Sequence, residues 1–536
     1  MNVTLRGPDA AQRNQLLARL TAAFAAGASF NAGFAPFGWW PVALLAPAAL
    51  FALIRGLPPR RAGWTGAAFG AGLFAFGTYW LYTCLHVFGL VPVWLTLILQ
   101  TVLVAVMCLY LAALCYLANR FWLKPSATRD WLVLPALWVL LEWLRGWLLS
   151  GLPWLSTGYA MIDSPLSGWA PVFGVYAVTW AAAGISAAIY VLFAPGVRIS
   201  RRFLAVAAAA TLFIVPALLA RHRWTEPSGA PIAIAAVQGA VPQDQKWQSK
   251  NRELTMQRYL RLSGEAWGSR LIIWPEASLP ALAPEIQDYL KDLAEQGRAH
   301  DADFAIGLVD YRPKSKEYFN GILVLGASES AMGGATGATR AGATGASGAT
   351  GASAEVGEGW YYKRHLVPFG EYFPVPAFVR SWLRLMSLPY DDFTAGSRRQ
   401  PVLSAAGQKL GLTICYEDAF GGQQLKVLRK ATLLVNVTND AWFGDSTARH
   451  QHLQIARMRA LEAGRYLVRA ANDGITAVID ARGRVVDRLP QFQEGVLRDD
   501  VQPMTGLTPY ARFGNYPVVL GALLSLALAV WRRRAG

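Results

Sequence analysis

Residues 411–420 read GLTICYEDAF, an apolar run that ends at Cys415 and continues into Tyr416, Glu417 and Asp418. A thiol at the elbow between a strand and a helix is a common way to present a nucleophile. The competing interpretation is a core cysteine at the end of a buried strand, which the acidic neighbours disfavour. We therefore predict a buried strand with a candidate nucleophile at its end.

A second apolar run leads into a carboxylate. Residues 271–278 read LIIWPEAS, so a predicted strand meets a Trp-Pro break directly before Glu276. A partly desolvated carboxylate at a strand end has a raised pKa and can act as a general base. An ordinary surface glutamate after a turn is the simpler interpretation when this stretch is taken alone.

The third stretch carries a lysine. Residues 361–374 read YYKRHLVPFGEYFP, with Lys363 after two aromatic residues and Glu371 eight positions further on. A lysine beside a reacting carbonyl can stabilise a developing oxyanion. A solvated strand lysine is again the simpler interpretation in isolation, and His365 reads as structural.

All three stretches lie in a segment where β-rich runs alternate with helical patterns, which is typical of an α/β domain. The predicted strands cover 231–238, 270–274, 303–310, 320–325, 409–415, 431–438, 466–470 and 475–480. The predicted helices include 247–266, 284–298 and 448–464. Residues 333–353 read GGATGATRAGATGASGATGAS, a flexible insertion rather than a collagen helix, because Pro is absent and Arg340 breaks the period of Gly.

The composition of the chain is that of a membrane protein. Of its 536 residues 54% are hydrophobic and 16% are charged, whereas soluble proteins carry about a quarter charged residues. The net charge of +16 is compatible with nucleic-acid binding, but Lys and Arg beside anionic lipid explain it better. Three of the four cysteines lie in apolar runs and only Cys415 lies in a polar region, so no disulfide framework is expected.

Eight apolar runs are long enough to cross a bilayer, which needs about 20 residues. They cover 14–33, 37–56, 63–85, 91–118, 131–149, 169–194, 202–220 and 516–531. The first run is open to a second interpretation, a signal peptide, but its length and the lack of a clean processing site favour an uncleaved span. We therefore predict an α-helical transmembrane bundle of eight spans.

Basic residues set the orientation of this bundle. With eight spans, every basic cluster beside a span falls on one side, which the positive-inside rule makes the cytoplasm. These clusters follow spans two, four, six and eight or precede span one, for example Arg60 and Arg61, Arg201 and Arg202, and Arg532, Arg533 and Arg534. The segment 225–515 then faces outward, and Arg221 and Arg223 count mildly against this.

The ordered elements P-E, Y-x-K and C-Y-E-D resemble the carbon–nitrogen hydrolase (nitrilase) superfamily, as does VNVTNDAWFGDS at 435–446. The resemblance implies an α-β-β-α sandwich. A nitrilase-like domain between seven spans and one span resembles, more narrowly, the apolipoprotein N-acyltransferase family. PFGEYFP, NDAWFG and LLEWLRGWLLSGLPW at 140–154 carry this likeness, and the Gly-Ala-Thr insertion is the visible departure.

The resemblance implies a role for each matching residue. Cys415 takes an acyl chain from a phospholipid as a thioester, Glu276 is the general base, and Lys363 stabilises the tetrahedral intermediates. The acceptor is the N-terminal amine of the diacylglyceryl-Cys of an apolipoprotein, in a ping-pong reaction. The residues expected to support the site or bind substrate are Glu371, Tyr416, Glu417, Trp247 and Trp442.

The resemblance also implies a domain order and a location. We expect a seven-span domain at 1–224, an extracytoplasmic catalytic domain at 225–510 with an insertion at 329–356, and a last span with a basic tail at 511–536. The location is the bacterial inner membrane with the catalytic domain on the periplasmic side. We expect a monomer, no nucleic acid, and no cofactor or metal.

Three other functions fit parts of the sequence. A membrane-tethered amidase would use the same three residues with water as acceptor, but a tether needs one span rather than seven. A transporter with a binding domain would have more charged or broken spans, and a scaffold with an inactive domain would not need the three residues. Residues 376–388 read either as an interfacial helix or as an ordinary surface helix, and Glu142 and Arg145 are placed to pair across one helix face.

Overall fold

The computed structural model describes residues 10–326, 359–372 and 392–535. The predicted insertion and the predicted helix at 376–388 lie outside the described residues. The described chain forms two compact units. The helical unit comprises 10–224, 445–458 and 508–535, and the α/β unit comprises the described parts of 225–444 and 459–507.

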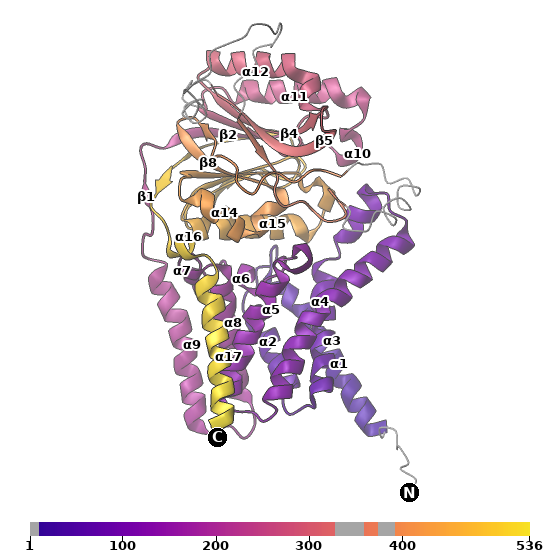
Figure 1. The fold of residues 1–536 in the computed structure, drawn as a ribbon, viewed down its shortest axis with the longest axis vertical. Coiled ribbons are helices and arrows are strands. Elements are labelled where there is room, and N and C mark those ends of the chain that lie inside the picture. The colour runs from indigo at the N-terminus through magenta and orange to yellow at the C-terminus, as the bar shows by residue number, and fades with distance from the viewer. Residues whose placement is uncertain (1–9, 327–358, 373–391, 536) are drawn as a thin grey trace, which may run out of the picture. The chain divides into compact units, whose positions relative to one another are not determined.

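The helical unit has a helix in each of the eight predicted spans (Figure 1). They are α1 (Ala10–Phe30), α2 (Val42–Leu53), α3 (Pro59–Gly77), α4 (Val93–Phe121), α5 (Leu134–Arg145), α8 (Val175–Phe193), α9 (Ile199–Leu219) and α17 (Tyr516–Ala535). Three of them, α4, α8 and α9, are long and apolar enough to cross a membrane, with mean hydropathies of 2.5, 1.7 and 2.1. Eight spans remain a prediction.

Two of the predicted apolar runs are interrupted by a break in the helix. The run 63–85 is broken after Gly77, where α3 ends and turns follow. The run 169–194 is broken at Gly174, whose φ of 77° is a left-handed conformation that ends α7 (Ala170–Phe173) before α8 begins. Hydropathy follows the polarity of the side chains, so it does not detect these breaks in the backbone.

Glu142 and Arg145 bind the loop after α5 rather than each other. Glu142 Oε1 accepts hydrogen bonds from Thr157 Oγ1 at 2.5 Å and Thr157 N at 3.0 Å. Arg145 Nη1 donates to the carbonyls of Leu152 and Trp154, each at 2.6 Å. The described contacts contain no ion pair between the two, so the predicted pairing is wrong, and both side chains fix the same loop.

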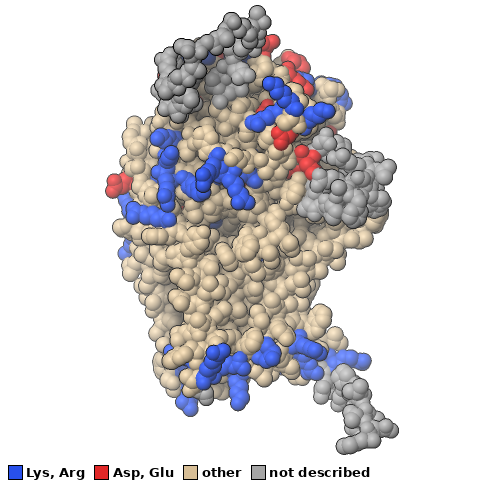
Figure 2. Space-filling view, viewed as in Figure 1, with Lys and Arg blue, Asp and Glu red and all other residues tan. Residues whose placement is uncertain are grey.

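Charge is unevenly distributed over the helical unit. Figure 2 shows Lys and Arg gathered at the end of this unit where the chain ends, and the rest of the unit's surface in this view is uncharged. The tail of α17 contributes Arg532, Arg533 and Arg534 to that end. This is the pattern from which the orientation was predicted.

The α/β unit contains two six-stranded sheets. In order, the first is β13 (Gly495–Val501), β2 (Ile232–Gln238), β3 (Leu271–Trp274), β4 (Asp303–Arg312), β5 (Glu317–Leu325) and β6 (Gly359–Tyr362). The second is β12 (Val485–Arg488), β11 (Ala477–Ile479), β10 (Leu467–Ala471), β9 (Leu433–Thr438), β8 (Gln408–Ile414) and β7 (Ser404–Ala405). All eight predicted strands are confirmed.

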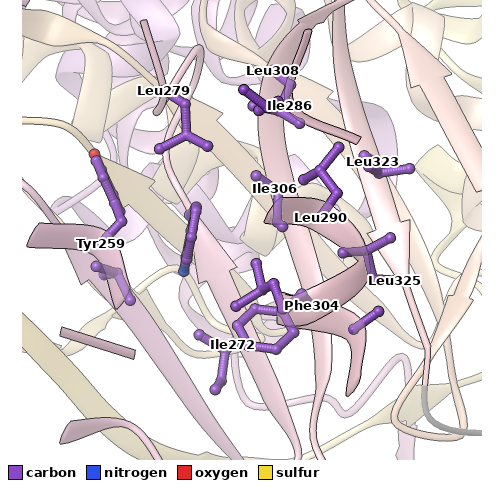
Figure 3. Close-up of a cluster of buried hydrophobic side chains, with 14 of the residues drawn as sticks. Tyr259, Ile272, Leu279, Ile286, Leu290, Phe304, Ile306, Leu308, Leu323 and Leu325 are labelled. Carbon is purple, nitrogen blue, oxygen red and sulfur yellow. The ribbon is translucent and has the colours of Figure 1, made fainter. Parts of the chain in front are cut away.

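Apolar side chains of both sheets form a core between them, including Ile273 of β3, Ile414 of β8 and Val437 of β9. A second core lies between the first sheet and the helices α11 (Arg252–Glu265) and α12 (Gln287–Ala299). Figure 3 shows Leu290 of α12 beside Ile306 of β4 in that core. With α14 (Gly421–Leu428) on the side of β8, the layers run helix, sheet, sheet, helix (Figure 1).

The centre of each sheet is parallel. Strand β3 pairs in parallel with β2 and β4, and β9 pairs in parallel with β8 and β10. Parallel strands end at the same edge of a sheet, where α/β proteins place their ligands. The segments that follow β3 and β8 carry Glu276 and Cys415, so the fold brings two of the predicted site residues to strand ends.

Candidate active site

Glu276 is the carboxylate on which the hydrogen bonds of the site converge. It is 7% exposed. Its Oε1 accepts from Asn320 Nδ2 at 2.7 Å and from Lys363 Nζ at 3.2 Å, and its Oε2 accepts from Asn439 N at 2.9 Å. Burial alone would raise the pKa of Glu276, but the Lys363 charge and the hydrogen bonds from Asn320 and Lys363 outweigh burial and hold that pKa below its usual value. The group is therefore an ionised base in the resting protein.

Lys363 follows β6 and is 1% exposed. Its Nζ lies between two carboxylates, 3.2 Å from Glu276 Oε1 and 2.8 Å from Glu371 Oε1. Burial lowers the pKa of Lys363, but the charges of Glu276 and Glu371 outweigh it and raise that pKa well above its usual value. Lys363 is therefore a fixed ammonium, suited to stabilise negative charge that develops beside it.

Cys415 directly follows β8 and has a φ of 51°, a left-handed conformation that side-chain-bearing residues rarely adopt. Strained backbone of this kind is concentrated at functional sites. Burial and the Glu276 charge raise the pKa of the Cys415 thiol well above its usual value, and the Lys363 charge opposes this. The thiol is thus protonated at neutral pH and needs a base before it can attack.

Glu371 completes the charged group. Its Oε1 accepts from Lys363 Nζ and, at 2.9 Å, from Asn320 Nδ2, and its Oε2 accepts from Val367 N at 2.8 Å. Two carboxylates and one ammonium sum to one negative charge for Glu276, Glu371 and Lys363 together. One carboxylate can therefore neutralise the lysine while the other remains available as a base.

Glu417 joins the nucleophile segment to the lysine segment. Its Oε2 accepts from Ile414 N at 2.8 Å and from the Tyr361 hydroxyl at 2.9 Å, and its Oε1 accepts from Arg364 N at 2.7 Å. It is 2% exposed, and burial raises its pKa. Because these donors belong to the residues that flank Cys415 and Lys363, Glu417 fixes the spacing of the two segments.

Two family models match the chain. The first, described as apolipoprotein N-acyltransferase N-terminal domain, matches residues 26–188 in the helical unit. The second, described as carbon–nitrogen hydrolase, matches residues 233–510 and so covers the α/β segment with every site residue described above.

Relatives named apolipoprotein N-acyltransferase match almost the whole chain. The protein of Methylococcus capsulatus is 40% identical and covers 94% of this chain and 94% of its own. Those of Nitrosomonas europaea and Azotobacter vinelandii are 39% and 38% identical, over 96% of this chain and 99% and 95% of their own. The chain belongs to the apolipoprotein N-acyltransferase family.

Membership in the apolipoprotein N-acyltransferase family confirms the acyltransferase class and the nitrilase-like fold of the α/β unit. Together with the three long apolar helices, it makes the chain a membrane enzyme. Among the described residues, no group of three or more His, Cys, Asp or Glu side chains is arranged as metal ligands.

The remaining predicted residues are Trp247, Trp442 and Tyr416. Trp247, directly after α10 (Gln243–Lys246), is 45% exposed, and Trp442 is 37% exposed. Tyr416 meets Phe420 edge to face, with ring centroids 5.0 Å apart. Exposed tryptophans suit an entrance to the site, and the roles of these three residues remain predictions.

Three residues that the sequence did not predict contact Glu276 or Glu371. Asn320 bridges Glu276 and Glu371 with one amide, Asn439 donates its backbone N–H to Glu276, and the Lys246 ammonium donates to the Glu276 carbonyl at 3.3 Å. A polar residue inside the apolar strand β5 was a usable signal for Asn320. Lys246 lies in the polar stretch VPQDQKW and gave no signal.

Proposed function

We propose that this chain transfers an acyl chain from a phospholipid to the N-terminal amine of the diacylglyceryl-Cys of apolipoproteins, through a thioester on Cys415. The observation that carries the proposal is the buried group in which Glu276 and Lys363 share a hydrogen bond of 3.2 Å, with Cys415 subject to the charges of both. The name of the relatives, apolipoprotein N-acyltransferase, indicates the acceptor and the transferred group.

In the first half-reaction, Glu276 accepts the thiol proton as the Cys415 sulfur attacks the ester carbonyl of the donor. A carbon–sulfur bond forms, and the Lys363 ammonium stabilises the oxyanion. The carbon–oxygen bond of the ester then breaks, and Glu276 returns the proton to the departing alkoxide of the lysophospholipid. The products of this step are a thioester and a lysophospholipid.

In the second half-reaction, the acceptor amine attacks the thioester carbonyl and Glu276 accepts one N–H proton. A carbon–nitrogen bond forms as the carbon–sulfur bond breaks, and the proton passes from Glu276 to the Cys415 thiolate. Both half-reactions balance with the same base and the same oxyanion partner, as a ping-pong mechanism requires. The raised pKa of the Cys415 thiol supports this use of a base, because the thiolate is not preformed.

The location of both substrates in a lipid layer supports a membrane-anchored enzyme. We propose eight spans in the order given by the sequence, with domains at 1–224, 225–510 and 511–536 and the catalytic domain on the periplasmic side of the inner membrane. The basic tail Arg532, Arg533 and Arg534 then lies in the cytoplasm.

The test is the acyl-enzyme itself. Purified protein in detergent is incubated with a phospholipid labelled in its acyl chain, and the label on the peptide that contains Cys415 is measured by mass spectrometry beside the Cys415→Ala variant. We expect a hydroxylamine-sensitive acyl group on Cys415 of the wild type alone. A diacylglyceryl peptide with a free N-terminus should discharge it, and the same peptide with an acetylated N-terminus should not.

Each outcome selects one function. A thioester that only water discharges would favour the membrane-tethered carbon–nitrogen hydrolase. If the wild type and Cys415→Ala are indistinguishable and no acyl-enzyme forms, the proposed mechanism is wrong.

A further inference from the structure

Lys246 is a buried cation beside the catalytic group that the proposed mechanism does not use. It ends α10, and it is 0% exposed. Its Nζ donates to the backbone carbonyl of Glu276 at 3.3 Å, which is the one hydrogen-bond partner that the described residues give it. An ammonium has three N–H groups and is rarely buried unless hydrogen bonds or opposite charges offset the free-energy cost of desolvation.

The turn that carries Lys246 is bound to Glu276 on two sides. Lys246 holds the main chain of Glu276 through its carbonyl. On the other side, Gln243 Oε1 accepts from Asn439 Nδ2 at 2.8 Å, and Asn439 N donates to Glu276 Oε2 at 2.9 Å. Asn472 Nδ2, which donates to Val241 O at 2.8 Å, anchors the chain just before the turn. The residues 241–246 therefore form a support for the Glu276 backbone and carboxylate.

The charge of Lys246 acts on the same carboxylate. It is among the causes that lower the pKa of Glu276. Burial lowers the pKa of Lys246 itself to about 8, while the charges of Glu276 and Asp473 oppose that shift. Lys363 and Lys246 together balance the charges of Glu276 and Glu371, and Asp473 adds a further negative charge that acts on Lys246.

We propose that Lys246 is a positioning residue that holds Glu276 in the ionised form needed for a base and fixes the backbone that carries it. This inference rests on the proposed role of Glu276 as the base. The charged or titratable groups that act on this pair are Lys363, Glu371, Cys415 and Asp473.

The test is the pH dependence of acyl-enzyme formation in the full-length protein, measured as the burst of p-nitrophenol from a short p-nitrophenyl ester. This ester needs the nucleophile and the base but no lipid recognition. The burst rate falls at low pH as Glu276 becomes protonated, and this part of the pH profile is the acid limb. Because removing a nearby positive charge raises the pKa of a carboxylate, Lys246→Met should move this limb to higher pH by about one unit. Lys246→Arg should leave it in place.

Lys246→Gln separates charge from hydrogen bonding and serves if Lys246→Met does not fold. Its amide can still donate to the Glu276 carbonyl, so an acid limb shifted as in Lys246→Met assigns the effect to charge. The inference is overturned if the acid limb stays at the wild-type pH in both Lys246→Met and Lys246→Gln, even if their melting temperatures fall. It is also overturned if the acid limb moves as far in Lys246→Arg as in Lys246→Met. A burst from the p-nitrophenyl ester without acyl label from the phospholipid would contradict the proposed transferase and leave this inference standing.

Discussion

Asn320 holds the two carboxylates of the site together at the scale of single residues. Its one amide group donates at 2.7 Å to Glu276 Oε1 and at 2.9 Å to Glu371 Oε1. Hydrogen bonds to charged groups contribute about 1.5–3 kcal/mol each. The amide thus offsets part of the repulsion between the Glu276 and Glu371 carboxylates. It also holds Glu276 within hydrogen-bond distance of Lys363.

We expect Asn320→Leu to slow acyl-enzyme formation about 10- to 100-fold, as the loss of one such hydrogen bond implies. The acid limb of the burst rate should also move to higher pH, because the Asn320 hydrogen bond opposes the rise in the pKa of Glu276 that burial causes. The matched control is Gln257→Leu, which removes an amide that donates to a carboxylate on the exposed face of α11 at 2.8 Å. A rate for Asn320→Leu within twofold of this control would show that the bridge has no role in the reaction.

The residues that sequence reasoning could find are those next to a strand end. Glu276 and Cys415 follow apolar runs that predict buried strands, so hydropathy alone indicates that they lie at strand ends. Asn320 and Asn439 reach the Glu276 carboxylate, and Lys246 reaches the Glu276 carbonyl, from other parts of the chain. Their contacts depend on the pairing of strands far apart in sequence, which no local pattern records.

At the scale of elements, buried strands were predictable and edge strands were not. Strands β3 and β9 are buried along their whole length, and their sequences, LIIW and LLVNVT, are mainly apolar. Strand β13 at the edge of its sheet reads GVLRDDV, and β6 is four residues long, so neither shows an apolar run. Both depend on a neighbouring strand for their conformation, and both were missed.

Helices α3 and α4 pack through glycine. A Cβ added at Gly66 would lie 2.3 Å from the Leu111 carbonyl oxygen and 2.8 Å from Cys115 Sγ. One turn earlier in α3, a Cβ at Gly63 would meet nothing closer than Tyr116 Cβ at 3.5 Å, which is ordinary contact. Small residues allow helix backbones to approach in this way in membrane proteins.

This pair of glycines gives a matched prediction. Gly66→Ala should destabilise the protein by about 1–3 kcal/mol, because the added methyl group forces the two helices apart. Gly63→Ala should be neutral or slightly stabilising, because alanine is the better helix former. Thermal unfolding of both variants in the same detergent measures the difference. Equal melting temperatures would mean that α3 and α4 can separate at little cost.

At the scale of the whole molecule, the distribution of charge is the feature that selects an orientation. In Figure 2 the surface of the helical unit is uncharged except at one basic end, which is the charge distribution that the positive-inside rule predicts. An even number of spans places the chain end of α17 and the loops before α3 and α9 on the same side. An odd number would put basic clusters on both sides, against the positive-inside rule.

Single cysteines test this orientation. In a chain whose four native cysteines are replaced by alanine, Gln257→Cys places a thiol on the exposed face of α11, and Ala535→Cys places one at the end of α17. We expect a membrane-impermeant maleimide to label only the Gln257→Cys variant in spheroplasts, and both variants once the membrane is permeabilised. Labelling of both variants in intact spheroplasts would mean that α17 does not cross the membrane. Labelling of Ala535→Cys alone would mean that the α/β unit faces the cytoplasm, away from the outer leaflet in which the proposed acyl donor lies.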